Sequence, residues 1–308
     1  MLIHSPRYNT PLREFGIDKP FALDRGTLVL QKLKDDGCRG LVAVEPRPIT
    51  REDALLVHTA EYLDSLSQDE TWKQIFELKP EEYDPAIATR PLHELYDDIA
   101  FKSGGTKMAV QNACGYGLAA NLGGGYHHAF PDQGRGFCAL NDVAIAIRSA
   151  QRAGLCKHAM IVDVDFHQGD GTARIFANDP TVFTLSIHSE EGWPETKQTS
   201  DLDIGILSSE QNTYNDRLAA GLDEALKTFT PDLVVFVAGS DAYELDVLPG
   251  TAFLKLSLEQ MRTRDEMVID TFVDRRVPLA MVFAGGYGPH VWEVHYNAVR
   301  HMLSHIDA

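Results

Sequence analysis

The chain has 308 residues, of which 44% are hydrophobic and 24% are charged, so it can bury a large core and is unlike a disordered protein. Its formal net charge of −17 disfavours direct binding to nucleic acid phosphates and favours cationic partners. The sequence contains neither an apolar run that could span a membrane nor a signal-peptide pattern, so we expect a cytoplasmic protein. The four cysteines lack C-x-x-C spacing and are expected to be buried thiols. Nothing in the sequence indicates the oligomeric state.

Short β-branched runs alternate along the chain with longer amphipathic segments, which predicts a parallel sheet with helices on both faces. In chain order, the clearest predicted strands are residues 41–46, 158–166, 181–188, 232–239 and 278–286. Helices are predicted from an N-cap at Thr50 through Val57, and over residues 141–153 and 211–229. Residues 63–92 are expected to form surface helices and loops. Because no composition shift divides the chain, we predict one domain over residues 1–308.

Ionisable residues crowd the end of the second predicted strand, in the segment IVDVDFHQGDG at residues 161–171. Side chains alternate along a strand, so Asp163, Asp165 and His167 should share one face. Carboxylate and imidazole ligands together suit Zn²⁺, with a further protein ligand from elsewhere and water in the remaining position. Asp241 follows another predicted strand and could supply a carboxylate at the same sheet edge, or could simply cap a turn. The spacing does not decide between Asp163 and Asp165 as ligand.

Two further motifs carry groups suited to acid–base chemistry. In NLGGGYHHAF, a glycine run precedes His127 and His128, which could act as general base and general acid beside a metal, with Asp163 and Asp170 orienting their rings. No Walker lysine follows these glycines, so phosphate binding fits poorly. In VFAGGYGPH, the hydroxyl of Tyr287 could donate to a developing oxyanion, although a packed aromatic is the simpler interpretation.

The motifs GGGYHH, GFCALND, DVDFHQGDG, AGSD and AGGY, in this order, resemble the signature of the zinc-dependent histone deacetylase family. The resemblance implies the arginase-deacetylase fold, a single α/β domain with a central, mostly parallel eight-stranded sheet between helices. Additional segments, SPRYN, DALLVHTAEYL, GGT near Gly104, and RDEMV with RRVP, are most similar to the class IV branch.

The resemblance implies a role for each matched position. One Zn²⁺, with Fe²⁺ as the alternative ion, would be held by Asp165, His167 and Asp241. The catalytic group would comprise His127 paired with Asp163, His128 paired with Asp170, and Tyr287 as the hydroxyl that polarises the substrate carbonyl.

The resemblance also implies a substrate tunnel and a structural K⁺. The narrow acyl-lysine tunnel would be lined by Gly136, Phe137 and Trp193. The K⁺ site would lie near Asp163, Asp165, His167, Ser186 and Ile187. One position departs from the class IV pattern: Asp170 stands where that class can carry Asn, which leaves the protonation state of His128 open, whereas Gln168 matches class IV.

The expected reaction is metal-assisted hydrolysis of an acyl-lysine in a protein or peptide, in which the acyl group is acetyl or a longer fatty acyl. The main alternative is a deacetylase for a cationic acylated small molecule such as an acetylpolyamine, which the acidic composition mildly favours. A dinuclear manganese hydrolase of the arginase type is disfavoured, because Phe166 and Gln168 stand where that family places further acids. A scaffold that binds acylated tails without catalysis is the remaining alternative.

Overall fold

The apolar runs of the sequence form the strands of one central sheet. The computed structural model describes residues 1–38, 41 and 43–306. The sheet contains eight strands in the order β2-β1-β3-β8-β7-β4-β5-β6, and every described pair is parallel. The strands are β1 (Leu2–Ile3), β2 (Ala43–Val44), β3 (Leu118–Asn121), β4 (Ala159–Asp163), β5 (Val182–Ser189), β6 (Leu202–Ile206), β7 (Leu233–Val237) and β8 (Leu279–Val282). The predicted α/β fold is confirmed. Of the strand predicted over residues 41–46, Val42 lies outside the described residues.

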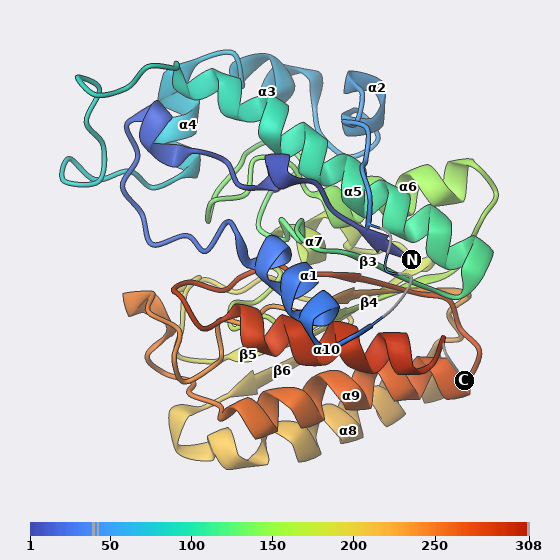
Figure 1. The fold of residues 1–308 in the computed structure, drawn as a ribbon. Helices are drawn as coiled ribbons and strands as arrows, with labels where there is room; N and C mark the ends of the chain where they lie inside the picture. The colour runs from blue at the N-terminus through green and yellow to red at the C-terminus, as the bar shows by residue number, and fades with distance from the viewer. Residues whose placement is uncertain (39–40, 42, 307–308) are drawn as a thin grey trace.

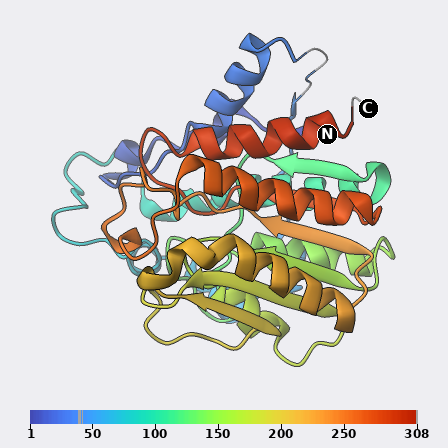
Figure 2. The same cartoon turned by 90° about the horizontal axis from the view of Figure 1, so that it is seen from below.

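Helices cover both faces of the sheet (Figure 1). One face packs against α1 (Arg25–Asp35), α8 (Tyr214–Thr228), α9 (Leu258–Asp274) and α10 (Trp292–Ser304). The other face packs against α5 (Leu95–Tyr116), α6 (Asp142–Arg152) and α7 (Asp170–Phe176). Figure 2 shows the strand arrows running in a common direction with the first set of helices laid across them. The short helices α3 (Ala60–Ser65) and α4 (Asp69–Ile75) lie toward the amino end of α5, whereas α2 (Arg51–Ala54) lies farther along it, where its Asp53 pairs with Lys107 of α5.

The two faces of the sheet explain why its strands look continuously apolar in the sequence. Along β4, Met160 and Val162 belong to the core beneath α8, α9 and α10, whereas Ala159 and Ile161 belong to the core beneath α5 and α6. All four side chains are buried. A strand covered on both sides carries apolar residues at every position, which is the pattern expected for a parallel sheet.

The helix predicted over residues 141–153 is confirmed at both ends, whereas each of the other two predicted helices differs from the structure at one end. The Asn141 side chain accepts a hydrogen bond of 3.0 Å from the Ala144 amide and begins α6 where expected. Thr50 forms the predicted capping box with Asp53, but the α-helix ends at Ala54 rather than Val57. The helix predicted over residues 211–229 begins at residue 214, because residues 208–213 form a 3₁₀ turn.

The prediction for residues 63–92 was wrong about burial. Trp72 of α4 is completely buried, and its indole nitrogen donates to the Leu66 carbonyl oxygen over 2.8 Å. Ile75 and Phe76 are buried beside it, in a third core that also includes Leu95 at the start of α5. Glutamates and prolines around these side chains conceal a buried apolar cluster that the sequence pattern does not resolve.

The segments that carry the candidate site residues follow the carboxyl ends of the central strands and lie at one edge of the sheet. β4 ends at Asp163, three residues before the predicted end, and Asp165 and His167 follow it in a bend. Asp241 follows β7, and the glycine turn that leads to Tyr287 follows β8. Because β4, β7 and β8 are adjacent and parallel, these segments meet. Among the described residues, no helix is both long enough and apolar enough to cross a membrane.

Candidate active site

Three side chains converge at this edge as a potential metal cluster. Nδ1 of His167 lies 2.9 Å from Oδ2 of Asp241 and 3.2 Å from Oδ1 of Asp165. One potential ligand atom from each residue lies within 4.8 Å of the other two, and all three residues are buried. Backbone amides hold both carboxylates in place, since Phe166 donates to Asp241 over 2.8 Å and Gly285 donates to Asp165 over 2.7 Å.

The charge of this cluster fits a divalent cation. Burial lowers the pKa of His167, but hydrogen bonds and charges from Asp165 and Asp241 outweigh burial and raise it to about 10. The site therefore has a strongly negative potential that a cation would neutralise. Two carboxylates and one imidazole form a borderline donor set that suits Zn²⁺ or Fe²⁺. The residues present thus fit the expected metal ion.

A pair of buried histidines lies beside the cluster, each oriented by its own carboxylate. Nδ1 of His127 lies 2.7 Å from Oδ2 of Asp163, and Nδ1 of His128 lies 2.7 Å from Oδ1 of Asp170. The hydrogen bond to His127 is what distinguishes Asp163 from Asp165. Nε2 of His127 points back toward the metal cluster, 3.7 Å from Oδ1 of Asp165.

The environment gives the two histidines different proton affinities. Burial lowers the pKa of His127, but the negative charges of Asp163 and Asp165 prevail and raise it to about 9. Burial lowers the pKa of His128 to about 4, and the neighbouring positive charge of His127 acts in the same direction. At neutral pH the first ring is therefore protonated and the second is neutral, which is the separation needed for an acid and a base.

Tyr287 is held as a hydrogen-bond donor at the same place. Burial, together with the charges of Asp241 and Asp165, raises its pKa well above the ordinary value, so the hydroxyl keeps its proton. Its backbone amide donates to Asp246 over 2.7 Å. A Cβ at Gly285 would lie 2.5 Å from the carboxylate oxygens of both Asp165 and Asp241, so only glycine fits in the turn that leads to the tyrosine.

Comparison with known proteins identifies the family. The sequence matches the family model described as a histone deacetylase domain over residues 19–303. The chain belongs to the histone deacetylase family. Histone deacetylase 2 of Arabidopsis thaliana is 32% identical, over 93% of this chain and 74% of that protein.

Two further relatives extend the match. Acetoin utilization protein AcuC of Bacillus subtilis is 31% identical, over 80% of this chain and 67% of that protein. An uncharacterized protein of Picosynechococcus sp. is 36% identical, over 99% of this chain and 96% of that protein. The family predicted from the motifs is confirmed, and it makes this chain a histone deacetylase-family hydrolase.

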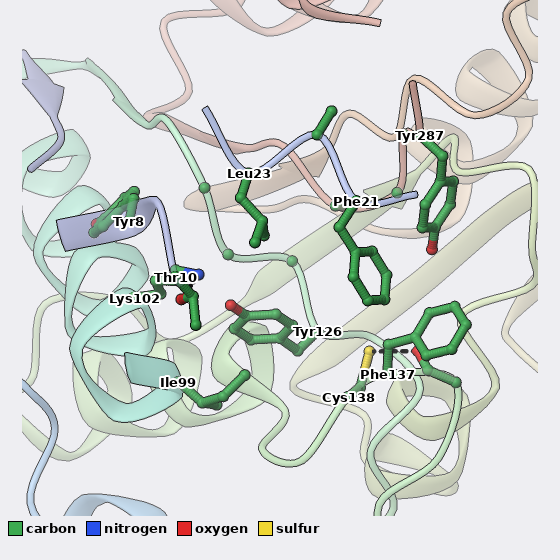
Figure 3. Close-up of a pocket in the computed structure, with 18 of the residues that line it drawn as sticks. Tyr8, Thr10, Phe21, Leu23, Ile99, Lys102, Tyr126, Phe137, Cys138 and Tyr287 are labelled. Carbon is green, nitrogen blue, oxygen red and sulfur yellow. Dashed lines mark hydrogen bonds between the residues drawn. The ribbon is translucent and has the colours of Figure 1, made fainter. Parts of the chain in front are cut away.

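The residues predicted to line the tunnel surround the histidine pair of this histone deacetylase-family chain. Gly136 has a φ of +52°, and a Cβ there would lie 2.8 Å from both His128 and Trp193. The Trp193 ring packs edge-on against His128, with centroids 4.7 Å apart. Phe137 packs near Tyr287, with ring centroids 6.2 Å apart (Figure 3). Gly136 and Phe137 line a cavity of about 130 Å³ with both histidines and Tyr287.

The strand pairing places the predicted potassium residues close together. Asp163 at the end of β4 is the register partner of Ser186 in β5, and Ile187 follows it. Both β5 residues are buried, and the Ser186 hydroxyl lies 2.9 Å from Nδ1 of His188. Gln168 stands where a dinuclear centre of the arginase type would carry a further acid, and its amide donates to Asp203 over 2.7 Å.

Sequence reasoning missed two arginines that support the site. Arg25, at the start of α1, donates to the Gly285 carbonyl oxygen over 2.8 Å and so braces the turn before Tyr287. Arg135 pairs with Oδ2 of Asp170 over 3.3 Å, on the side away from His128. No local pattern connects Arg25 with a turn 260 residues away. Arg135 directly precedes the GFCALND motif, and this proximity was its only signal.

The far end of the cavity carries an unexpected cation. Lys102 of α5 is 7% exposed, and its ammonium donates to the Thr10 hydroxyl over 2.8 Å. Burial lowers its pKa to about 8. Figure 3 shows Lys102, Thr10 and Ile99 at one end of the pocket and Phe137 and Tyr287 at the other. The cavity therefore runs from the histidine pair to a polar end.

Proposed function

We propose that this chain is a zinc-dependent lysine deacylase, most similar to class IV, that hydrolyses the amide between an acyl group and the side-chain amine of lysine. The observation that carries this proposal is the placement of two buried imidazoles, each held through Nδ1 by its own carboxylate at 2.7 Å, beside one cluster of three potential metal ligands. Such a pair supplies both a base and an acid for amide hydrolysis.

The metal would be held by Asp165, His167 and Asp241. When bound, the ion would supply Lewis-acid polarisation of the amide carbonyl and a lowered pKa for a water molecule. Among the described residues, further acids do not extend this cluster, which favours a mononuclear centre over a dinuclear manganese centre.

The chain's own residues would handle the protons. His128 is neutral and its Nδ1 is held by Asp170, so its Nε2 can accept the proton that water loses as its oxygen adds to the carbonyl carbon. His127 is protonated and can give a proton to the lysine nitrogen as the carbon–nitrogen bond breaks. The Tyr287 hydroxyl would donate a hydrogen bond to the carbonyl oxygen as negative charge develops there. The products are a carboxylic acid and a free lysine amine.

Gly136, Phe137 and Trp193 would guide the lysine stem to these groups. Aromatic and glycine surfaces suit a straight methylene chain, because they provide apolar contact without a bulky obstruction. Beyond the histidines, apolar side chains that include Leu23 and Ile99 line the same cavity, which supports an acyl group longer than acetyl.

The alternative substrate is an acylated small cation such as an acetylpolyamine, which the net charge of −17 favours. Side-by-side assays of the zinc-loaded protein on acyl-lysine peptides and on acetylspermidine separate the two. Our proposal predicts a higher kcat/KM for the peptides. A higher kcat/KM for acetylspermidine would assign the protein to small-molecule deacetylation.

We also propose that the backbone around Asp163, Asp165, His167, Ser186 and Ile187 binds a structural K⁺. The register of β4 and β5 supports this site, because it places the first and fourth of these residues opposite each other. Replacing K⁺ by an organic cation at constant ionic strength should lower the melting temperature. An unchanged melting temperature would contradict the proposal.

A further inference from the structure

A second group of metal-ligand side chains lies on the helical face of the molecule. His301 is in the last turn of α10, His305 is the residue that caps this helix, and Asp270 lies opposite them on α9. The two helices pack side by side (Figure 1). One potential ligand atom from each of the three residues lies within 4.8 Å of the other two.

The side chains converge on one point rather than forming separate pairs. Oδ1 of Asp270 lies 2.6 Å from Nε2 of His301 and 2.9 Å from Nε2 of His305. The two Nε2 atoms are only 3.3 Å apart, and the rings are perpendicular. If both nitrogens carried protons, two N–H groups would be crowded together, because the nitrogens are only 3.3 Å apart. A cation at this point would instead use the lone pairs of all three atoms.

The spacing and the surroundings favour a cation. Histidines four residues apart on a helix face can bind one ion together. The strand β8 lies between α9 and α10 in the sequence, and both helices run antiparallel to it. Their carboxyl-terminal ends therefore lie at the same end of the molecule, where unpaired carbonyl groups favour a positive charge. Oε1 of Glu266 lies 4.0 Å from Nδ1 of His301, so it adds a negative charge near the group without a hydrogen bond to that ring.

This group is separate from the candidate active site. α10 starts near the carboxyl edge of the sheet, where the catalytic residues lie, and His301 and His305 come at its opposite end. The side chains of the three residues are 22–45% exposed, so water can reach the site and complete the coordination of an ion.

We propose that Asp270, His301 and His305 bind a divalent transition-metal ion of the zinc class, which cross-links the carboxyl-terminal ends of α9 and α10. Two imidazoles and one carboxylate are ligands that such ions prefer, with a water molecule in the fourth position. The site would add stability near the end of the chain, and the chemistry at the sheet edge would not depend on it.

The test is a zinc count on full-length protein after dialysis against a zinc buffer. We expect two zinc ions per chain in the wild type and one in the double variant His301→Gln, His305→Gln, which should keep its hydrolytic rate. His290→Gln is a matched control, because His290 also pairs with a carboxylate, that of Glu293 at 3.2 Å, but lies outside both groups of potential ligands. This control should bind two.

A second measurement, the melting temperature, distinguishes loss of the metal site from unfolding of the variant. Adding zinc to protein that already holds one equivalent should raise the melting temperature of the wild type and of His290→Gln, and should leave that of the double variant unchanged. One zinc ion in the wild type, or two in the double variant, would overturn the proposal. Asp241→Asn should lose only the zinc ion at the candidate active site and keep the one at Asp270, His301 and His305. A variant at either site therefore reports on that site alone.

Discussion

The hydroxyl of Tyr287 offers the sharpest mutational test of the proposed chemistry. The ring is 8% exposed and packs near Phe21 and Phe137, with centroid distances of 5.7 Å and 6.2 Å. Tyr287→Phe therefore keeps the packing and removes only the hydrogen-bond donor. Losing one oxyanion donor typically costs about 2.7–4 kcal/mol in the transition state, which is roughly a hundredfold to a thousandfold in kcat. We expect this loss with little change in KM, because the bond strengthens only as charge develops.

The assay measures kcat and KM of the zinc-loaded variant on an acyl-lysine peptide. Tyr62→Phe is the matched control, since its buried hydroxyl donates to the Ala139 carbonyl oxygen over 2.6 Å. The control should lose about 1 kcal/mol of stability and keep its turnover. A decrease of less than about tenfold in kcat for Tyr287→Phe would contradict the oxyanion role.

Three other predictions follow from the same geometry. The value of kcat/KM should decrease at alkaline pH as His127, with a pKa of about 9, loses the proton that it donates. A bound cation lowers this pKa and therefore moves the decrease to lower pH. A decrease that persists unchanged in His127→Gln would refute the assignment. Gly136→Ala should reduce kcat/KM at least about tenfold, because its Cβ would lie 2.8 Å from both His128 and Trp193, and unchanged kinetics would show that the tunnel lies elsewhere. Lys102→Met should raise the kcat/KM ratio of long fatty acyl to acetyl peptides, because it removes a buried charge from the end of the cavity; an unchanged ratio would place the acyl chain outside it.

The main sheet was predictable because its strands are buried on both faces. The runs around Ile161, Val235 and Met281 are continuously apolar, and strands of this kind stand out from amphipathic helices. β1 has only two residues and β6 is partly exposed, so neither stands out in the sequence, whereas the two residues of β2 lie within the strand predicted over residues 41–46. The core around Trp72 was missed because its apolar residues are spread over short helices and loops among charged neighbours.

The site was predictable where its groups lie close together in the sequence. The segment from Asp163 to Asp170 supplies one metal-facing pair and both carboxylates that orient histidines, so its density of ionisable groups was informative. Period-two alternation did not distinguish Asp163 from Asp165, because both were expected on one face and only the contact with His127 separates them. Arg25 reaches the site through the fold alone.

The measurement that tests the central claim most directly is metal reconstitution followed by a ladder of acyl-lysine peptides. Protein stripped by a chelator and then supplied with zinc should release the free lysine amine, with longer fatty acyl groups preferred over acetyl. Asp241→Asn, prepared in the same way, should remain inactive, because the cluster loses a charged ligand. A folded, zinc-loaded wild type that hydrolyses no acyl-lysine of any length would contradict the account and favour a protein that binds acylated tails without cleaving them.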